Sequence, residues 1–130
     1  MATIEFKSDN FEQLIKDSET NKSTLFIDFW AEWCGPCKMF GPVFEEASEK
    51  NPDMVFAKCN TEIQQEVAGQ FGIRSIPTLA IFREGVLIFM QPGALPAPAF
   101  ADLIEKVKDI DMEEVHAEVA KEKEKEAAQA

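Results

Sequence analysis

The feature that most restricts the fold is an apolar run from Leu25 to Trp30, which leads directly into a pair of cysteines, Cys34 and Cys37. The run reads Leu-Phe-Ile-Asp-Phe-Trp, and its one polar member is Asp28. A run without polar alternation is typical of a strand covered on both faces, as in parallel sheets. The sequence therefore predicts a buried strand that ends at a dithiol motif and carries one buried acid.

The rest of the chain predicts alternating strands and helices around this strand. Apolar runs indicate further strands over residues 4–6, 54–59, 78–82 and 86–90, with a tight turn at Glu84-Gly85. Helical spacing of apolar residues indicates helices that begin near Asp9, near Cys34 and after Asn60 (with Ile63 on the apolar face). A last helix carries Phe100, Leu103, Ile104 and Val107 on one face. The order β-α-β-α-β-α-β-β-α predicts an α/β fold with helices on both faces of the sheet.

The composition excludes several classes of protein. The 130 residues suit one domain, and 24 Asp and Glu against 13 Lys and Arg give a net charge of -11. This acidic balance argues against a nucleic-acid partner, which needs clustered positive charge. No apolar run approaches the ~20 residues of a membrane span, and the first residues lack a hydrophobic secretory segment. We therefore expect a cytoplasmic protein without a membrane partner.

The last 20 residues differ from the rest of the chain. Residues 111–130 carry 7 acids and 3 bases and little apolar content, whereas residues 1–110 carry 17 acids and 10 bases. Asp111 with Glu114 is spaced as a capping box, the start of a helix. We expect a domain over residues 1–110 and a charged, helical or flexible extension over residues 111–130.

The two cysteines stand where a strand gives way to a helix. Unpaired backbone N–H groups at a helix start stabilise a thiolate, so Cys34 is the candidate nucleophile. Cys37, one turn inside the helix and more shielded, is placed to resolve a mixed disulfide by attacking the Cys34 sulfur. Asp28 is expected to be buried, with its pKa raised by desolvation, and to accept the Cys37 proton.

The block from Trp30 to Lys38 resembles the active site of the thioredoxin family, and the resemblance extends over residues 4–109. It also includes Asp28, Pro42, Lys58 and the segments 72–74, 76–78 and 93–94. The resemblance implies the thioredoxin fold, a central mixed β-sheet of about five strands flanked by helices on both faces. It also implies a protein-disulfide reductase that works through a Cys34–Cys37 dithiol–disulfide cycle.

The resemblance assigns further site residues. It places Lys58 on the neighbouring strand, where its charge offsets that of Asp28. It also implies that the peptide bond before Pro77 is cis and that Pro77 packs against the two cysteines, although only ~5% of X-Pro bonds are cis in folded proteins. The implied substrate groove is formed by Trp33, Gly35, Pro36, Ile76, Pro77, Gly93 and Ala94. Pro92 stands where many members of the family have an aliphatic residue.

The resemblance also implies how the protein is supplied with electrons. Gly35-Pro36 between the cysteines is the dipeptide of the reducing members of the family. The expected electron donor is a flavin-dependent thioredoxin reductase that uses NADPH, and the expected substrates are oxidised client proteins. We expect no bound cofactor and no metal in the protein itself.

Three other interpretations compete with this one. Cys34 and Cys37 could form half of a zinc site with Cys59 and His116, but the spacing of the ligands is wrong for one. Cys59 is instead expected to be a core residue whose side chain points away from Lys58. A binding module or holdase with incidental redox activity is the main alternative function. An exported oxidant is disfavoured by the Gly-Pro dipeptide.

The strand over residues 86–90 is apolar at five consecutive positions, although the matching strand of the family lies at a sheet edge. Exposed apolar edges favour aggregation, so we expect a cover for its outer face. The hypothesis is that the extension provides it as a helix through Met112, Val115 and Val119. The alternative cover is a homodimer contact through this strand, in place of the expected monomer, and the third interpretation is a groove partly screened by the last helix of the domain itself. Deletion of residues 111–130, followed by measurement of the melting temperature and oligomer size, tests it.

Overall fold

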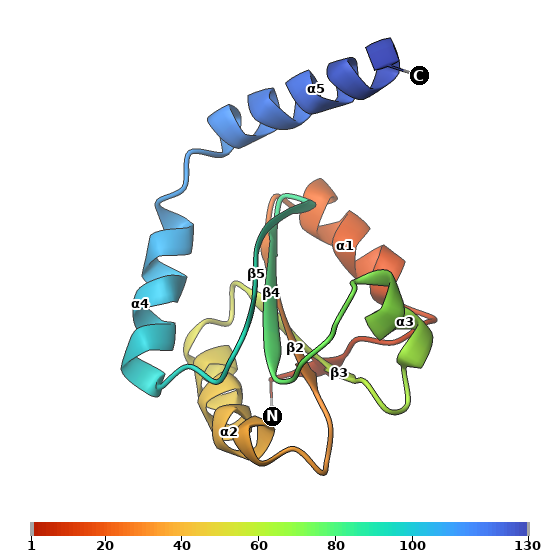
Figure 1. Ribbon diagram of the computed structural model, residues 1–130. Coiled ribbons are helices and arrows are strands. Elements are labelled where there is room, and N and C mark those ends of the chain that lie inside the picture. The colour runs from red at the N-terminus through yellow and green to blue at the C-terminus, as the bar shows by residue number, and fades with distance from the viewer. Residues whose placement is uncertain (1, 130) are drawn as a thin grey trace. The chain divides into compact units, whose positions relative to one another are not determined.

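β2 (Thr24–Trp30) lies at the centre of a five-stranded sheet in the computed structural model, which describes residues 2–129 (Figure 1). On one side it pairs in parallel with β3 (Val55–Asn60), which pairs in parallel with the short β1 (Ile4–Glu5). On the other side it pairs antiparallel with β4 (Thr78–Arg83), which pairs with the edge strand β5 (Val86–Pro92). The sheet is therefore mixed, as expected, and the strand that leads into the cysteines is its middle strand.

Helices cover both faces of this sheet. α1 (Phe11–Thr20) and α3 (Gln65–Gln70) lie on one face, and α2 (Gly35–Lys50) lies on the other (Figure 1). The chain divides into two compact units, residues 1–100 and 101–130. α4 (Ala97–Lys108) runs from the first unit into the second, and the second unit also contains α5 (Met112–Gln129). The predicted α/β architecture is thus confirmed.

Successive side chains of β2 enter two different apolar layers. Leu25, Ile27 and Phe29 belong to the cluster that contains residues of α1 and α3. Phe26 points to the opposite face, where its ring stacks on that of Phe56 with centroids 4.6 Å apart. Because both layers are apolar, the strand shows no alternation in its sequence. Its one acid is therefore held inside an apolar layer.

Two helices begin later than their sequence patterns suggest. Asn10, and not Asp9, is the residue before α1, and its Oδ1 accepts the backbone N–H of Lys7 at 2.7 Å. Asn60 Oδ1 accepts the N–H groups two and three residues further on, at 3.0 and 3.3 Å, and so forms a turn instead of a helix cap. Ile63 consequently lies in this turn with 73% of its surface exposed, and α3 starts only after it.

The turn between β4 and β5 is the one that the sequence predicts. Glu84 and Gly85 both have positive φ angles, 53° and 80°. A Cβ on Gly85 would lie 2.7 Å from the Cβ of Glu19, so only glycine fits there. The turn leads into the edge strand, where Leu87 and Met90 are 42% and 40% exposed.

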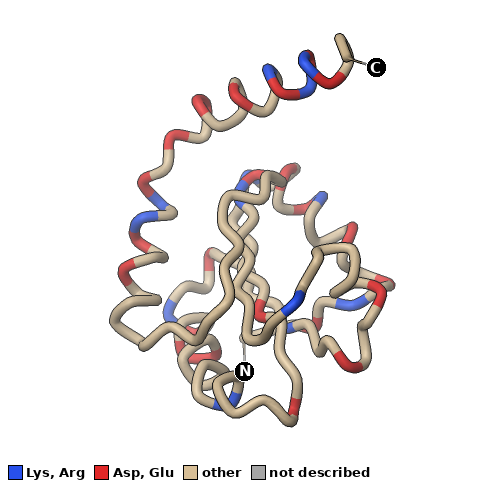
Figure 2. Tube along the Cα trace, viewed as in Figure 1, with Lys and Arg blue, Asp and Glu red and all other residues tan. Residues whose placement is uncertain are grey.

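The extension is helical. Asp111 Oδ1 accepts two N–H groups of the first turn of α5, at 3.1 and 3.2 Å, which confirms the predicted start of this helix. Acidic and basic residues follow one another along α5 (Figure 2). Lys121 pairs with Glu118 at 3.6 Å and Lys125 with Glu122 at 3.7 Å. Such exposed pairs each contribute only about 0.3–0.5 kcal/mol, so this helix is weakly stabilised by them.

Candidate active site

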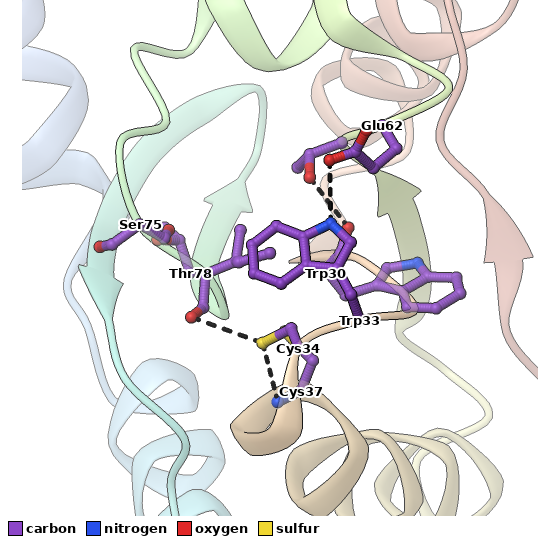
Figure 3. The surroundings of a disulfide bond; sticks show 9 residues. Trp30, Trp33, Cys34, Cys37, Glu62, Ser75 and Thr78 are labelled. Carbon is purple, nitrogen blue, oxygen red and sulfur yellow. Dashed lines mark hydrogen bonds between the residues drawn. A yellow bond between two sulfur atoms is a disulfide. The ribbon is translucent and has the colours of Figure 1, made fainter.

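Cys34 and Cys37 form a disulfide at the start of α2, with their Cα atoms 5.2 Å apart (Figure 3). Cys34 is the residue before the helix and has an extended backbone, with φ -88° and ψ 113°. Pro36 occupies the first turn, where its missing N–H leaves no hydrogen bond unmade. The strand-to-helix junction predicted from the sequence therefore brings the two sulfurs together.

The helix start supplies a hydrogen-bond donor to the first cysteine. The backbone N–H of Cys37 donates to Cys34 Sγ at 3.2 Å (Figure 3). In the reduced protein the same N–H would point at the Cys34 thiolate, in addition to the partial positive charge of the helix start. Among the hydrogen bonds of residues 2–129, the one that a backbone N–H donates to these sulfurs goes to Cys34, so the two sulfurs have different surroundings.

Burial does not separate the two cysteines. Cys34 is 4% exposed and Cys37 is 3% exposed. Cys37 is thus the less exposed of the two, as expected, but the difference is too small to distinguish them. The asymmetry between them comes from the helix start.

A cis peptide bond joins Ile76 to Pro77 beside the disulfide. This agrees with the family resemblance and differs from the general preference for trans. The carbonyl oxygen of Ile76 lies 3.7 Å from Cys34 Sγ, and the N–H of Gly93 donates to the carbonyl oxygen of Pro77 at 2.8 Å. β4 and β5 thus bring the segments around residues 76 and 93 to the disulfide, although they are distant from it in sequence.

An exposed rim surrounds the disulfide. Pro77 is buried and Ile76 is half-buried, but the other residues expected in the substrate groove are exposed: Trp33, Gly35, Pro36, Gly93 and Ala94. A pocket of about 420 Å³ opens beside Trp33 and Ile76, and Arg74 also lines it. Buried sulfurs inside an exposed, largely apolar rim suit attack on a disulfide that another protein presents.

Trp33 is held in its exposed position by a hydrogen bond that the sequence did not reveal. Its Nε1–H donates to Glu62 Oε1 at 2.9 Å, while 68% of its surface stays exposed (Figure 3). Glu62 lies in the turn after β3, the same turn that replaces the expected helix start. No pattern in the sequence links these two residues, because the contact depends on how this turn folds.

Asp28 is fully buried on β2. Neither of its carboxylate oxygens has a hydrogen-bond partner within the described part of the chain. Its strand neighbours in register are Lys58 on β3 and Leu79 on β4. Burial raises the pKa of Asp28 to about 7, the Lys58 ammonium acts to lower it, and Glu45 acts to raise it further. At neutral pH this carboxyl can therefore both accept and release a proton.

Lys58 lies on the strand next to Asp28, as expected, but its ion pair is with another acid. Its Nζ lies 3.9 Å from Oε1 of Glu45, a residue of α2. The same Nζ lies 4.8 Å from the centroid of the Trp30 ring. The positive charge of Lys58 therefore acts on two carboxylates, those of Glu45 and Asp28. Nothing in the sequence pattern distinguishes Glu45 from the other acids of its helix.

Cys59 is fully buried in the core, on the face of β3 opposite to Lys58. Burial raises the pKa of its thiol to about 12, with a smaller contribution from Asp28. A thiol of this kind is protonated at neutral pH and is a poor nucleophile. Across residues 2–129, no group of three or more His, Cys, Asp and Glu side chains is placed to hold a metal ion. Within the same residues, no helix has the length and apolar content that a membrane crossing requires.

Comparison with known proteins gives one consistent result. The family model for thioredoxin matches residues 2–106. The chain is 55% identical over 119 residues to a putative thioredoxin 2 of Streptomyces coelicolor, covering 92% of this chain and 86% of the relative. It is 42% identical over 106 residues to a thioredoxin of Synechocystis, covering 81% and 96%. The crystal structure of spinach chloroplast thioredoxin f (short form) matches with a TM-score of 0.70 at 27% identity, covering 82% and 91%.

Proposed function

Because the chain belongs to the thioredoxin family, a family of thiol–disulfide oxidoreductases, we propose that Cys34 is its nucleophile and Cys37 its resolving thiol in the reduction of client disulfides. The observation that carries this assignment is the N–H of Cys37, which donates to Cys34 Sγ at the start of α2. This donor favours the thiolate on Cys34 over that on Cys37.

The cycle begins with the reduced protein. The Cys34 thiolate attacks one sulfur of a client disulfide, forms a mixed disulfide and displaces the other client sulfur as a thiolate. Cys37 then gives its proton to the Asp28 carboxylate and attacks Cys34 Sγ. The Cys34–Cys37 disulfide forms, and the second client thiolate leaves. Two electrons have moved from the dithiol to the client, whose two thiolates take up protons.

The exposed rim is proposed as the binding surface for clients. Trp33, Gly35 and Pro36 form one side of it, and Ile76, Pro77, Gly93 and Ala94 form the other. The N–H of Gly93 is taken by Pro77, which fixes the position of the second side. Pro92, exposed next to Gly93, has no N–H to donate to a client backbone, so its only backbone hydrogen-bonding group is its carbonyl.

We further propose that a flavin-dependent thioredoxin reductase regenerates the dithiol with NADPH in the cytoplasm. The test combines this protein with a bacterial thioredoxin reductase, NADPH and insulin, and follows the absorbance of NADPH. We expect many equivalents of NADPH to be oxidised per protein molecule. Without insulin, a single equivalent should be consumed, to reduce the Cys34–Cys37 disulfide. A single equivalent in the presence of insulin would instead support a binding module with incidental redox activity.

The role of Asp28 as the base predicts a change in pH dependence. In Asp28→Asn the resolving step should slow at least about tenfold at pH 7, because the amide cannot accept the Cys37 proton. The limb of the rate profile near pH 7, which follows the raised pKa of Asp28, should disappear. Single-turnover release of a chromophoric thiol from its mixed disulfide, between pH 5 and 9, measures both effects. An unchanged profile would remove Asp28 from the mechanism.

A further inference from the structure

Glu45 is an acid of α2 whose carboxylate is held inside the protein. Its Oε1 accepts the hydroxyl of Thr3 at 2.7 Å. Its Oε2 is buried and has no hydrogen-bond partner in the described part of the chain. The side chain is only 23% exposed, so water compensates little of its charge. The positive group that pairs with this carboxylate is Lys58, at 3.9 Å.

Lys58 is the charge that Glu45 and Asp28 share. It stands directly beside Asp28 in the pairing of β2 with β3, and its side chain is 24% exposed. The charged or titratable groups around Asp28 are Lys58 and Cys59 on β3 and Glu45 on α2. The β4 partner in register, Leu79, carries no charge.

Each carboxylate weakens the hold of Lys58 on the other. The Lys58 ammonium is held 3.9 Å from the Glu45 carboxylate, and the negative charge of Glu45 offsets part of the positive potential that Lys58 creates at Asp28. Glu45 therefore raises the free energy of a negative charge on Asp28. Without Glu45, Lys58 would act on Asp28 alone and would favour its ionised form more strongly. A base is most effective when its pKa lies close to the working pH.

We propose that Glu45 is a positioning residue for the proton transfer by Asp28, because it holds Lys58 and thereby tunes how readily Asp28 takes up a proton. This inference rests on the proposed role of Asp28 as the base for Cys37. Thr3 contributes to the same arrangement, because its hydroxyl donates a hydrogen bond to the Glu45 carboxylate oxygen that faces Lys58.

Glu45→Gln tests the proposed role of Glu45, because glutamine has nearly the same side-chain shape as glutamate. The amide oxygen can still accept the Thr3 hydroxyl, while the negative charge is gone. The carboxyl carbon of Asp28 is followed by ¹³C NMR against pH in the oxidised full-length protein, with Asp28→Asn to identify its signal. We expect the titration midpoint of Asp28 to fall by about half a pH unit or more.

Glu46→Gln is the matched control, because it removes the same charge from the next residue of α2. Glu46 is 62% exposed and pairs with Lys50 at 2.9 Å. Water and salt screen such a charge, so the midpoint of Asp28 should stay at its wild-type value. A midpoint that moves equally in both variants would show a general charge effect and would overturn the assignment of Glu45.

Rate profiles of the resolving step separate this inference from the function on which it rests. If Glu45→Gln shifts both the titration of Asp28 and the rate profile to lower pH, both assignments stand. Suppose that Glu45→Gln leaves the titration of Asp28 unchanged, while the resolving rate of the wild-type protein follows that titration. The role of Glu45 is then overturned, and Asp28 remains the base. If the titration moves and the rate does not follow, Glu45 tunes Asp28, but Asp28 is not the base.

Discussion

Replacing Cys34 with serine is expected to lower insulin-disulfide reduction to the rate of the buffer reductant alone. A serine hydroxyl is not ionised at neutral pH, so the proposed nucleophile is lost, and Cys37 is left without the partner that completes the cycle. Precipitation of the insulin B chain in dithiothreitol, followed by turbidity, measures the loss. Cys59→Ala is the matched control, because this thiol is buried in the core and has a pKa raised to about 12.

Replacing Cys37 with serine should have a different result from replacing Cys34. The Cys34 thiolate still attacks the client, but no thiol resolves the mixed disulfide, so client proteins should remain covalently attached. Non-reducing electrophoresis followed by mass spectrometry identifies the trapped clients. Comparable trapping on Cys34→Ser would mean that the two cysteines have the opposite roles.

Replacing Asp28 with asparagine is expected to stabilise the folded protein at pH 8. Folding raises the pKa of this carboxyl from 3.8 to about 7, so the folded state binds the proton more tightly than the unfolded state. The folded state is therefore penalised as the pH rises from about 4 to about 7, and the penalty then stays constant. A shift of this size corresponds to about 4 kcal/mol as an upper figure.

The measurement is unfolding by urea of the oxidised protein at pH 4 and at pH 8. The gain from Asp28→Asn should be small at pH 4, where the wild-type carboxyl is protonated in the folded state, and should be large at pH 8. Asp53→Asn, at an exposed position, should change the free energy of unfolding by no more than about 0.5 kcal/mol at either pH. Equal gains from Asp28→Asn at both pH values would argue against a proton-linked penalty.

The sequence was most informative where local chemistry and topology coincide. An unbroken apolar run must be covered on both faces, and this requirement alone predicts that Asp28 lies inside the molecule. Two cysteines at a strand-to-helix junction are constrained by the helix start, so the sequence predicts their close approach, and Cys34 is the expected nucleophile from its position. The cis bond before Pro77 came from the family resemblance alone, since the residues themselves favour trans.

The parts that escaped prediction depend on contacts between distant segments. Glu45 looks like any acid on a helix until α2 packs beside β3 and the hydroxyl of Thr3 reaches it from 42 residues away. The same holds for Glu62 and Trp33, which are 29 residues apart and meet only because the turn after β3 is not a helix. Short-range patterns carry no information about such pairs. The cover of the strand over residues 86–90 stays a prediction.

The central position of β2 affects which parts of the molecule open first. All of its residues from Thr24 to Phe29 are buried, and both of its edges are paired to other strands. Amides of such a strand exchange their hydrogens with solvent only through global unfolding, whereas edge strands and exposed loops exchange through local fluctuations. The Cys34–Cys37 disulfide therefore follows closely on a strand that we expect to be among the last segments to open, whereas we expect the exposed rim around it to exchange through local fluctuations.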